Sequence, residues 1–93
     1  MTKTEITTQI TTAYQTILAR KGRRHGDWIT LTDLRIELDE TFPRYEIDEA
    51  LREMYRTQQA ILIPESNQKI LTEWDRWSAV EIGEQMKHLI SIR

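Results

Sequence analysis

Apolar residues recur at steps of three and four along residues 4–20. The repeating positions are Ile6, Ile10, Ala13, Tyr14, Ile17 and Leu18. This spacing places them on one face of a helix, so the pattern predicts a helix over 4–20 that buries a single stripe. Arg20 and Lys21 would complement the dipole in its last turn, and Gly22 supplies a stop.

A second helical pattern spans about residues 31–40, after a short extended segment at Trp28-Ile29. Thr30 followed three residues later by Asp33 is typical of a capped helix start. The sequence predicts one apolar face made of Leu31, Leu34, Ile36 and Leu38. Pro43 disfavours helix at Phe42, which we expect to fill the core between two helices.

The clearest amphipathic pattern predicts a helix over about residues 44–58. Its buried stripe would be Ile47, Ala50, Leu51, Met54 and Tyr55. Its outward face would carry both charge signs, with Tyr45, Asp48, Glu49, Arg52, Glu53 and Arg56. Arg44 begins the same helix, so three arginines stand against four acids along it.

The remaining residues alternate short strands with one short helix. Ala60–Pro64 reads as a strand, a turn follows at 65–68, and residues 69–71 read as a second short strand. Residues 72–75 open a helix that carries Trp74, Trp77 and Val80 and ends at Ile82-Gly83. We expect the terminal strand, 87–92, to pair with residues 61–63.

The length and composition indicate a single small domain over residues 1–93. At 39% hydrophobic and 30% charged residues, the chain is typical of a globular protein rather than a disordered one. The absence of cysteine excludes a disulfide framework and thiol chemistry. Apolar runs reach about four residues, far below the roughly 20 that span a bilayer, and no signal peptide is evident. We therefore expect a soluble cytoplasmic protein without a membrane partner.

Positive charge gathers at one place in an acidic chain of net charge −2. Residues 1–26 carry five Lys or Arg against one acid, whereas residues 27–93 carry eight against fourteen. We name as the basic corner the five residues Arg20, Lys21, Arg23, Arg24 and His25. They would contact a phosphate backbone, or form a solvated loop whose charges cap the preceding helix.

Catalytic motifs are missing from the sequence. No phosphate-binding glycine loop and no H-E-x-x-H motif occurs. Glu84 and His88 stand at a helical spacing of four, but a metal site needs three or four ligands. We therefore expect no enzyme activity, no cofactor, no metal and no small-molecule substrate.

Trp74 and Trp77 admit two interpretations. They would cover the part of the core that a short hairpin leaves open, because a small domain needs apolar mass. Alternatively, one of them projects outward and anchors a protein partner. The sequence favours the first interpretation.

The order of elements resembles the winged helix-turn-helix superfamily. The resemblance rests on Trp28-Ile29-Thr30, the runs L-T-D-L-R-I-E-L and E-I-D-E-A-L-R-E-M-Y-R, and the strand A-I-L-I-P-E. It implies a mainly helical α+β fold, with a three-helix core and a C-terminal β-hairpin wing that contains a short helical insert. It also implies a DNA-reading third helix, wing contacts to the DNA backbone and, often, a homodimer. By position, the implied DNA-binding residues are Arg44, Tyr45, Arg52 and Arg56 on the helix and Asn67, Gln68 and Lys69 near the wing.

Two functions follow from these patterns. The resemblance and the basic corner favour a small protein of transcription-regulator type that binds double-stranded DNA. The acidic body, the charge-mixed third helix and the tryptophans of the insert favour instead a protein-interaction module on the same scaffold. Such a module would be an accessory subunit, or would occupy the nucleic-acid site of a partner. We rank DNA binding first.

Overall fold

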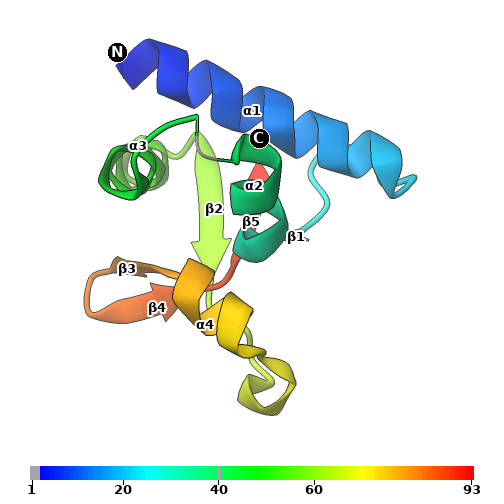
Figure 1. Cartoon of the computed structure of the whole chain (residues 1–93), viewed down its shortest axis with the longest axis vertical. Coiled ribbons are helices and arrows are strands. Elements are labelled where there is room, and N and C mark those ends of the chain that lie inside the picture. Colours follow the sequence, from blue (N-terminus) through cyan, green and yellow to red (C-terminus); the bar gives the residue numbers. More distant parts are fainter. Residues whose placement is uncertain (1–2, 40) are drawn as a thin grey trace.

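In a computed structural model that describes residues 3–39 and 41–93, three helices pack against a three-stranded antiparallel sheet (Figure 1). The helices are α1 (Lys3–Arg20), α2 (Leu31–Leu38) and α3 (Arg44–Arg56). The strands of the sheet are β1 (Ile29–Thr30), β2 (Ala60–Ile63) and β5 (Leu89–Ile92). The fold is therefore α+β, about half helical, and the three long helices lie where the hydrophobic pattern predicts them.

Helix α1 packs chiefly against α2 and α3 and buries its predicted stripe. Ile10 and Tyr14 are completely shielded from solvent. The helix ends at Arg20, and Gly22 just beyond it adopts a φ of +65°, which residues with a Cβ disfavour. The amide of Arg23 then donates to the carbonyl of Leu18 over 2.8 Å, which closes a Schellman motif.

Helix α2 begins as predicted but buries a different face. The hydroxyl of Thr30 accepts a hydrogen bond from the amide of Asp33 over 3.1 Å. Arg35 is buried, whereas the side chain of Ile36 is 70% exposed, so the prediction that placed Ile36 in the apolar face is wrong. The reason is helical geometry: the inward positions at steps of three and four are Leu31, Leu34, Arg35 and Leu38. The predicted end at residue 40 lies outside the described residues, and α2 itself ends at Leu38.

Helix α3 buries most of its predicted stripe. Its shielded residues are Ile47, Ala50, Leu51 and Met54. Tyr55 is 38% exposed, contrary to prediction, because it lies at the edge of the stripe, where its ring faces Lys87 Nζ at 5.4 Å. Phe42, just before the helix, is buried as predicted. The helix is shorter than predicted because Gln58 takes a φ of +63° and the amide of Gln59 donates back to Met54.

Strand β5 forms the centre of the sheet, between β1 and β2. Ile90 pairs with Ile29 on one side and with Leu62 on the other. The predicted pairing of the terminal strand with residues 61–63 is therefore confirmed. That strand begins only at Leu89, because Lys87 belongs to another strand and His88 joins the two.

We call residues 64–88, which connect β2 to β5, the insert. It contains a 3-10 turn η1 (Gln68–Ile70), α4 (Glu73–Ser78), β3 (Val80–Ile82) and β4 (Gln85–Lys87). In Figure 1 it extends away from α1, with η1 at the far end. The strand predicted at 69–71 is wrong: the side chain of Asn67 accepts from the amide of Lys69 and starts a turn.

The short helix predicted as far as Ile82 is also too long. Helix α4 ends at Ser78, and Val80–Ile82 pairs with Gln85–Lys87 as a hairpin. Gly83 and Glu84 form its two-residue turn, both with positive φ, which suits the twist of a tight hairpin. Glu84 and His88 therefore do not share a helix, and the helical spacing considered for a metal pair is absent.

Candidate functional site

Arginine side chains hold the insert against α2 and α3, next to the buried Ala79 and Val80. Three of them donate hydrogen bonds to backbone carbonyls between the end of α4 and β3: Arg35 Nε to Ser78 over 2.7 Å, Arg44 Nη2 to Ala79 over 3.1 Å and Arg52 Nε to Glu81 over 3.0 Å. Charged donors make stronger hydrogen bonds than neutral ones. These contacts fix the position of α4 relative to the helices.

Arg35 is the centre of this arrangement. Only 8% of its side chain is exposed, and its Nη2 lies 2.6 Å from Asp48 Oδ1 on α3. Asp48 Oδ2 also lies 3.7 Å from Arg44 Nε. One carboxylate thus faces two guanidinium groups, and Arg35 joins α2 to both α3 and the insert.

A threonine–aspartate contact adds a fourth connection. The hydroxyl of Thr32 on α2 donates to Asp75 Oδ1 on α4 over 2.5 Å. Asp75 also closes the capping box of α4, since its Oδ2 accepts from the amide of Thr72. These hydrogen bonds to Thr32 and Thr72 lower the pKa of Asp75, because they favour its ionised form.

Trp74 and Trp77 point into solvent rather than into the core. Their side chains are 70% and 59% exposed, so the interpretation favoured by the sequence, that they cover the core, is wrong. The inward face of α4 carries Asp75 and Ser78 instead, which bind Thr32 and Arg35. The two indoles meet edge to face, with their centroids 6.3 Å apart.

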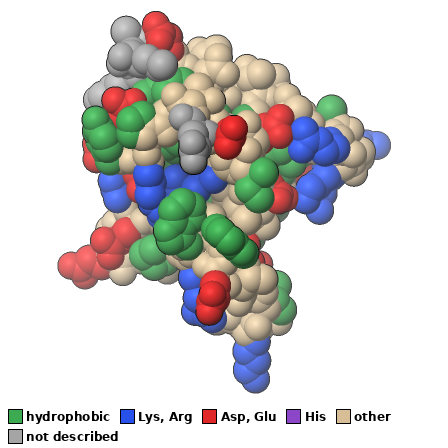
Figure 2. All heavy atoms as spheres, in the orientation of Figure 1, with side chains coloured by type: hydrophobic (Ala, Val, Ile, Leu, Met, Phe, Trp, Pro, Cys, Tyr) green, Lys and Arg blue, Asp and Glu red, His purple; other side chains and the backbone are tan. Residues whose placement is uncertain are grey.

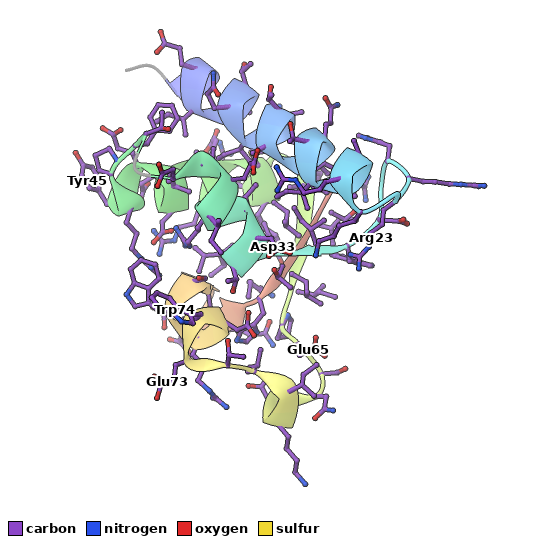
Figure 3. The ribbon with its side chains drawn as sticks, turned by 45° about the vertical axis from the view of Figure 1, so that its right-hand side comes forward. Arg23, Asp33, Tyr45, Glu65, Glu73 and Trp74 are labelled. Atoms are coloured by element: carbon purple, nitrogen blue, oxygen red, sulfur yellow. The ribbon has the colours of Figure 1, made fainter. Side chains whose placement is uncertain are left out.

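These indoles belong to a larger apolar face. Ile36 and Tyr45 are 70% and 68% exposed. Figure 2 shows hydrophobic side chains gathered over α4, with cationic side chains between them and α3. In Figure 3 Tyr45 and Trp74 lie on the same side of the molecule. Exposed aromatic residues of this kind, clustered and rimmed by charge, mark interaction surfaces.

Two hollows adjoin on this face and together form what we call the groove. The larger, of about 420 Å³, is lined by Arg35, Asp39, Phe42, Pro43, Arg44, Ile47 and Trp77. The smaller, of about 220 Å³, is lined by Thr32, Arg35, Ile36, Asp39, Trp74, Trp77 and Ser78. They share Arg35, Asp39 and Trp77, so the groove passes along Trp77 between α2, the start of α3 and α4.

Arg44 has an unsatisfied nitrogen in the wall of the groove. Among the described residues, its Nη1 is the one buried side-chain nitrogen or oxygen that has no hydrogen-bond partner. The guanidinium carbon lies 4.4 Å from the centre of the Trp77 ring, a cation–π contact. Burial, together with the charge of Arg35, lowers the pKa of Arg44. Nη1 is therefore shielded without an acceptor, although 38% of the Arg44 side chain as a whole is exposed.

Two residues of the basic corner are paired with acids of α2. Arg20 Nη2 lies 3.0 Å from Glu37, and Lys21 Nζ lies 2.7 Å from Asp33. Both contacts join the end of α1 to α2. They also reduce the positive charge available to a ligand.

The rest of the basic corner is less neutralised. Arg23 Nη1 donates to the carbonyl of Trp28 over 2.7 Å. In the part of the chain that the structure describes, the side chain of Arg24 makes no hydrogen bond or ion pair. Tyr14 fixes the loop from below, by donating to the carbonyl of Asp27, and meets His25 edge to face.

The other residues nominated for DNA contact lie on two further parts of the surface. Arg44 and Arg52 bind the insert, and Arg56 pairs with Glu53. Tyr45 is exposed at the start of α3, and the wing residues Asn67, Gln68 and Lys69 lie at η1. Figure 3 places Arg23 on the side of the molecule opposite Tyr45, and Figure 1 places η1 at the far end of the insert. The nominated residues therefore do not converge on one face.

Sequence reasoning missed Arg35, Ile36 and Asp39 as residues of a candidate site. A signal for the first two exists in the sequence. Arg35 follows Leu31 by four positions and so belongs to the buried stripe, whereas Ile36 follows it by five and does not. An arginine inside a buried stripe and an isoleucine outside it together indicate a functional surface.

Residues 3–39 and 41–93 contain neither a cluster of metal ligands nor a membrane-spanning helix. Within those residues, no group of three or more His, Cys, Asp or Glu side chains is placed to hold a metal ion. No helix there combines the length and apolar character required to cross a membrane.

Comparison with known proteins gives no relative from which a function can be transferred. No protein-family model, no curated protein and no solved structure matches this chain. The case for a function therefore rests on the groove, the arginines that hold the insert and the exposed indoles.

Proposed function

We propose that this chain is a protein-interaction module, built on a winged-helix scaffold, that docks a partner protein in the groove along Trp77. The observation that carries the proposal is the outward position of Trp74 and Trp77 on an insert fixed by Arg35, Arg44 and Thr32. Rigid, exposed aromatic side chains bind partners at low cost in conformational entropy. The groove beside them supplies the concave apolar surface that an anchor residue needs.

The order of elements supports the winged-helix scaffold. Three helices, with β1 between the first two, come before β2 and β5 in the chain. The three strands form a sheet of order β1-β5-β2. The connection between β2 and β5 takes the place of the wing. In this chain, that connection folds back onto α2 and α3 through the arginine contacts.

The charge of the same face supports a protein partner over DNA. On α3, Arg44 and Arg52 are the arginines that would contact DNA bases, and both already donate to carbonyls of the insert. Glu49 is 65% exposed beside Arg52, and a carboxylate there opposes a phosphate backbone. An apolar, charge-mixed surface is typical of protein interfaces.

A peptide-display selection on the purified chain tests the proposal. The library presents random 12-residue segments, about the length that crosses an interface of modest size, and retention is compared between wild type and the double variant Trp74→Ala, Trp77→Ala. We expect peptides rich in large apolar residues to bind wild type and to lose binding at least about tenfold on the double variant.

Ile70→Ala is the matched control for this selection. Ile70 is 61% exposed on η1, outside the groove, so its removal changes exposed apolar area without touching the candidate surface. Binding that is kept by Ile70→Ala and lost by the tryptophan variant supports the proposal. Peptides that bind the tryptophan variant as well as they bind wild type contradict it.

DNA binding is the second candidate, and the basic corner favours it. Arg23 and Arg24 keep exposed positive charge that no acid neutralises among the described residues. Exposed cations of this kind release counterions when they meet phosphates. Lys69 on η1 is a further exposed cation, on another part of the surface.

Fluorescence anisotropy of a mixed-sequence duplex across a salt series tests this second candidate. If DNA binds, Arg23→Ala should weaken binding to every sequence and lower the salt dependence by about one phosphate contact. Arg52→Ala should instead relax sequence preference. An absence of binding at low salt rules DNA out, whereas DNA binding that is indifferent to both changes shows that these residues do not make the contacts.

A further inference from the structure

The apolar face of the groove carries both a projecting side chain and a hollow that suits it. Trp74 is 70% exposed and lines only the smaller hollow. The larger hollow is lined without Trp74, by residues from the start of α3 such as Pro43 and Ile47. Trp77 lines both hollows. The projecting indole and the larger hollow therefore lie on opposite sides of Trp77.

The larger hollow is wide enough to receive an indole. Its volume is about 420 Å³, whereas a cavity of about 150 Å³ already holds a benzene molecule. Phe42, Pro43 and Ile47 give its wall apolar surface. The ring of Trp77 adds an aromatic partner, of the kind that Trp74 already meets edge to face within one chain. A tryptophan from another molecule thus fits the hollow by size and by chemistry.

The charges of the groove balance, so they select neither an acidic nor a basic partner. Arg35 and Arg44 line it, and the carboxylate of Asp48 lies 2.6 Å from Arg35 Nη2 and 3.7 Å from Arg44 Nε. Asp39 is exposed and lines both hollows. Two guanidinium groups thus stand with two carboxylates. Because both signs are present, such a surface does not repel an identical surface.

The positions of the indole and the hollow satisfy the condition for pairing with a second copy. In a two-fold dimer, the same patch of both subunits forms the interface, and every contact between unlike residues occurs twice. An axis that passes close to Trp77, perpendicular to the face, carries Trp74 of one copy over the larger hollow of the other. The same rotation brings the second indole over the first hollow. Both hollows are then filled, and the assembly closes at two copies.

The exposed apolar residues supply enough area for a weak dimer. Tyr45, Trp74 and Trp77 are 68%, 70% and 59% exposed, so together they offer roughly 300 to 500 Å². Ile36, which is 70% exposed, adds to this area. A standard interface takes about 800 Å² from each partner, of which the rim of the groove would supply the rest. An interface of this size is consistent with a dissociation constant of roughly 1 to 100 µM.

Resting on the proposed function, we propose that the partner that docks in the groove is a second copy of this chain. The two copies meet across a two-fold axis near Trp77, and each inserts Trp74 into the larger hollow of the other. Ile36, which lines only the smaller hollow, then faces Pro43, which lines only the larger one, across the interface. The groove is thus the interface of a homodimer.

Sedimentation velocity of the full chain over about 1 to 300 µM measures the association. We expect wild type to pass from monomer to dimer in this range. Trp74→Ala, shown to be folded by circular dichroism, should weaken dimerisation at least about tenfold, because each dimer loses two insertions. Ile70→Ala is the control, since Ile70 is 61% exposed on η1 outside the groove; it should change the dissociation constant less than about twofold.

Cross-linking tests the two-fold arrangement. The chain contains no cysteine, so a single introduced cysteine reports one position. Ile36→Cys and Pro43→Cys replace exposed residues that line different hollows. With a short bismaleimide, a mixture of the two variants should cross-link at least about threefold more than either variant alone, because the axis places unlike positions opposite each other. Variants that cross-link best with themselves overturn the arrangement.

The results separate this inference from the function it rests on. A chain that stays monomeric, yet selects peptides that depend on Trp74 and Trp77, overturns the second copy and leaves the docking function in place. A dimer that Trp74→Ala leaves unchanged uses another face and also overturns the inference. A monomeric chain without such peptides overturns both. Peptides that bind the groove should dissociate the dimer, and a peptide bound there to an intact dimer contradicts the shared site.

Discussion

Two regions of this molecule are stabilised by different forces. The body, formed by α1 to α3 and the sheet, is held by buried apolar side chains such as Ile10, Leu51 and Ile90, which are completely shielded. The insert buries few apolar side chains, chiefly Val80, and is held in addition by Arg35, Arg44 and other polar side chains that bind its backbone. The insert adds Val80 to that core, whereas its two indoles stay outside, beside the exposed Ile36 and Tyr45 of the body.

The difference explains how a small chain presents a large apolar face without burying it. If the insert docked through Trp74 and Trp77, both indoles would be buried in the core. Hydrogen bonds from Arg35 and Thr32 fix α4 by its opposite face instead. Polar docking is directional, so the orientation of the exposed indoles is specified along with the position of the helix.

The largest expected effect comes from removing the central arginine. Arg35→Ala leaves the largely buried Asp48 without its closest partner and frees the carbonyl of Ser78. We expect a loss of about 3 to 5 kcal/mol in the free energy of unfolding, as for other broken buried ion pairs. Urea unfolding followed by circular dichroism measures it. A loss no larger than that of Arg56→Ala, an exposed arginine, would contradict the central role of Arg35.

A comparable loss is expected from a cavity in the body. Leu51→Ala empties a fully buried position on α3 and should destabilise the chain by about 2 to 5 kcal/mol. Because the insert docks on the body, tryptophan fluorescence and circular dichroism should report the same unfolding midpoint. Insert probes that unfold separately from the body would show that the two regions are independent.

A smaller effect is expected at the contact between α2 and α4. Thr32→Val keeps the shape of the side chain but removes the donor to Asp75. The loss should be about 1 kcal/mol, since Asp75 stays partly solvated and keeps its bond to Thr72. Native-state hydrogen exchange should show faster opening in β3 and α4 than in α1. Equal acceleration in both regions would contradict a local role.

Acid should weaken the insert before the body. Burial lowers the pKa of His88 below its ordinary 6.5, and hydrogen bonds from Thr32 and Thr72 lower that of Asp75 below 3.8. In both cases, the unfolded state takes up protons at a higher pH than the folded one. The stabilisation from each group is therefore complete above its ordinary pKa. It is lost as pH falls through the pKa that the group has in the folded state.

His88 should be protonated before Asp75 as pH falls, because its ordinary pKa is the higher of the two. Protonation removes the hydrogen bond that its Nδ1 accepts from the amide of Glu65. Urea unfolding across this pH range measures the effect, with His88→Gln as the comparison. A wild-type profile that is flat from above 6.5 to below 3.8 would contradict it.

The smallest effect on stability is expected from the indole that stands furthest out. Trp74→Ala should change the free energy of unfolding by no more than about 0.5 kcal/mol, because 70% of the side chain is already exposed. Thermal unfolding by circular dichroism is sufficient to measure it. A loss of several kcal/mol would mean that Trp74 belongs to the core.

The hydrophobic pattern predicted the body well because local rules decide it. The stripes of α1 and α3, the cap at Thr30 and the pairing of residues 61–63 all follow from period, cap chemistry and strand composition. Errors arose where a tertiary contact decides the outcome. Tyr55, for example, left the core because it lies at the edge of its stripe, next to Lys87.

The insert was predicted poorly for the same reason. Trp74, Trp77 and Val80 share a spacing of three that reads as one buried face. The partners that orient α4, Thr32 and Arg35, lie 43 positions away in the sequence, and no local pattern reports them. The groove, which depends on that orientation, was therefore beyond sequence reasoning.

One measurement tests both whether the insert is firmly docked and whether its indoles face solvent. In the variant Trp28→Phe, Trp74→Phe, the single emitter is Trp77, which is 59% exposed and in contact with Arg44. Acrylamide quenching and time-resolved anisotropy are recorded on the folded chain. We expect strong quenching together with anisotropy that decays only with the tumbling of the whole molecule. Weak quenching would place Trp77 in the core, and fast local decay would show that the insert is not held.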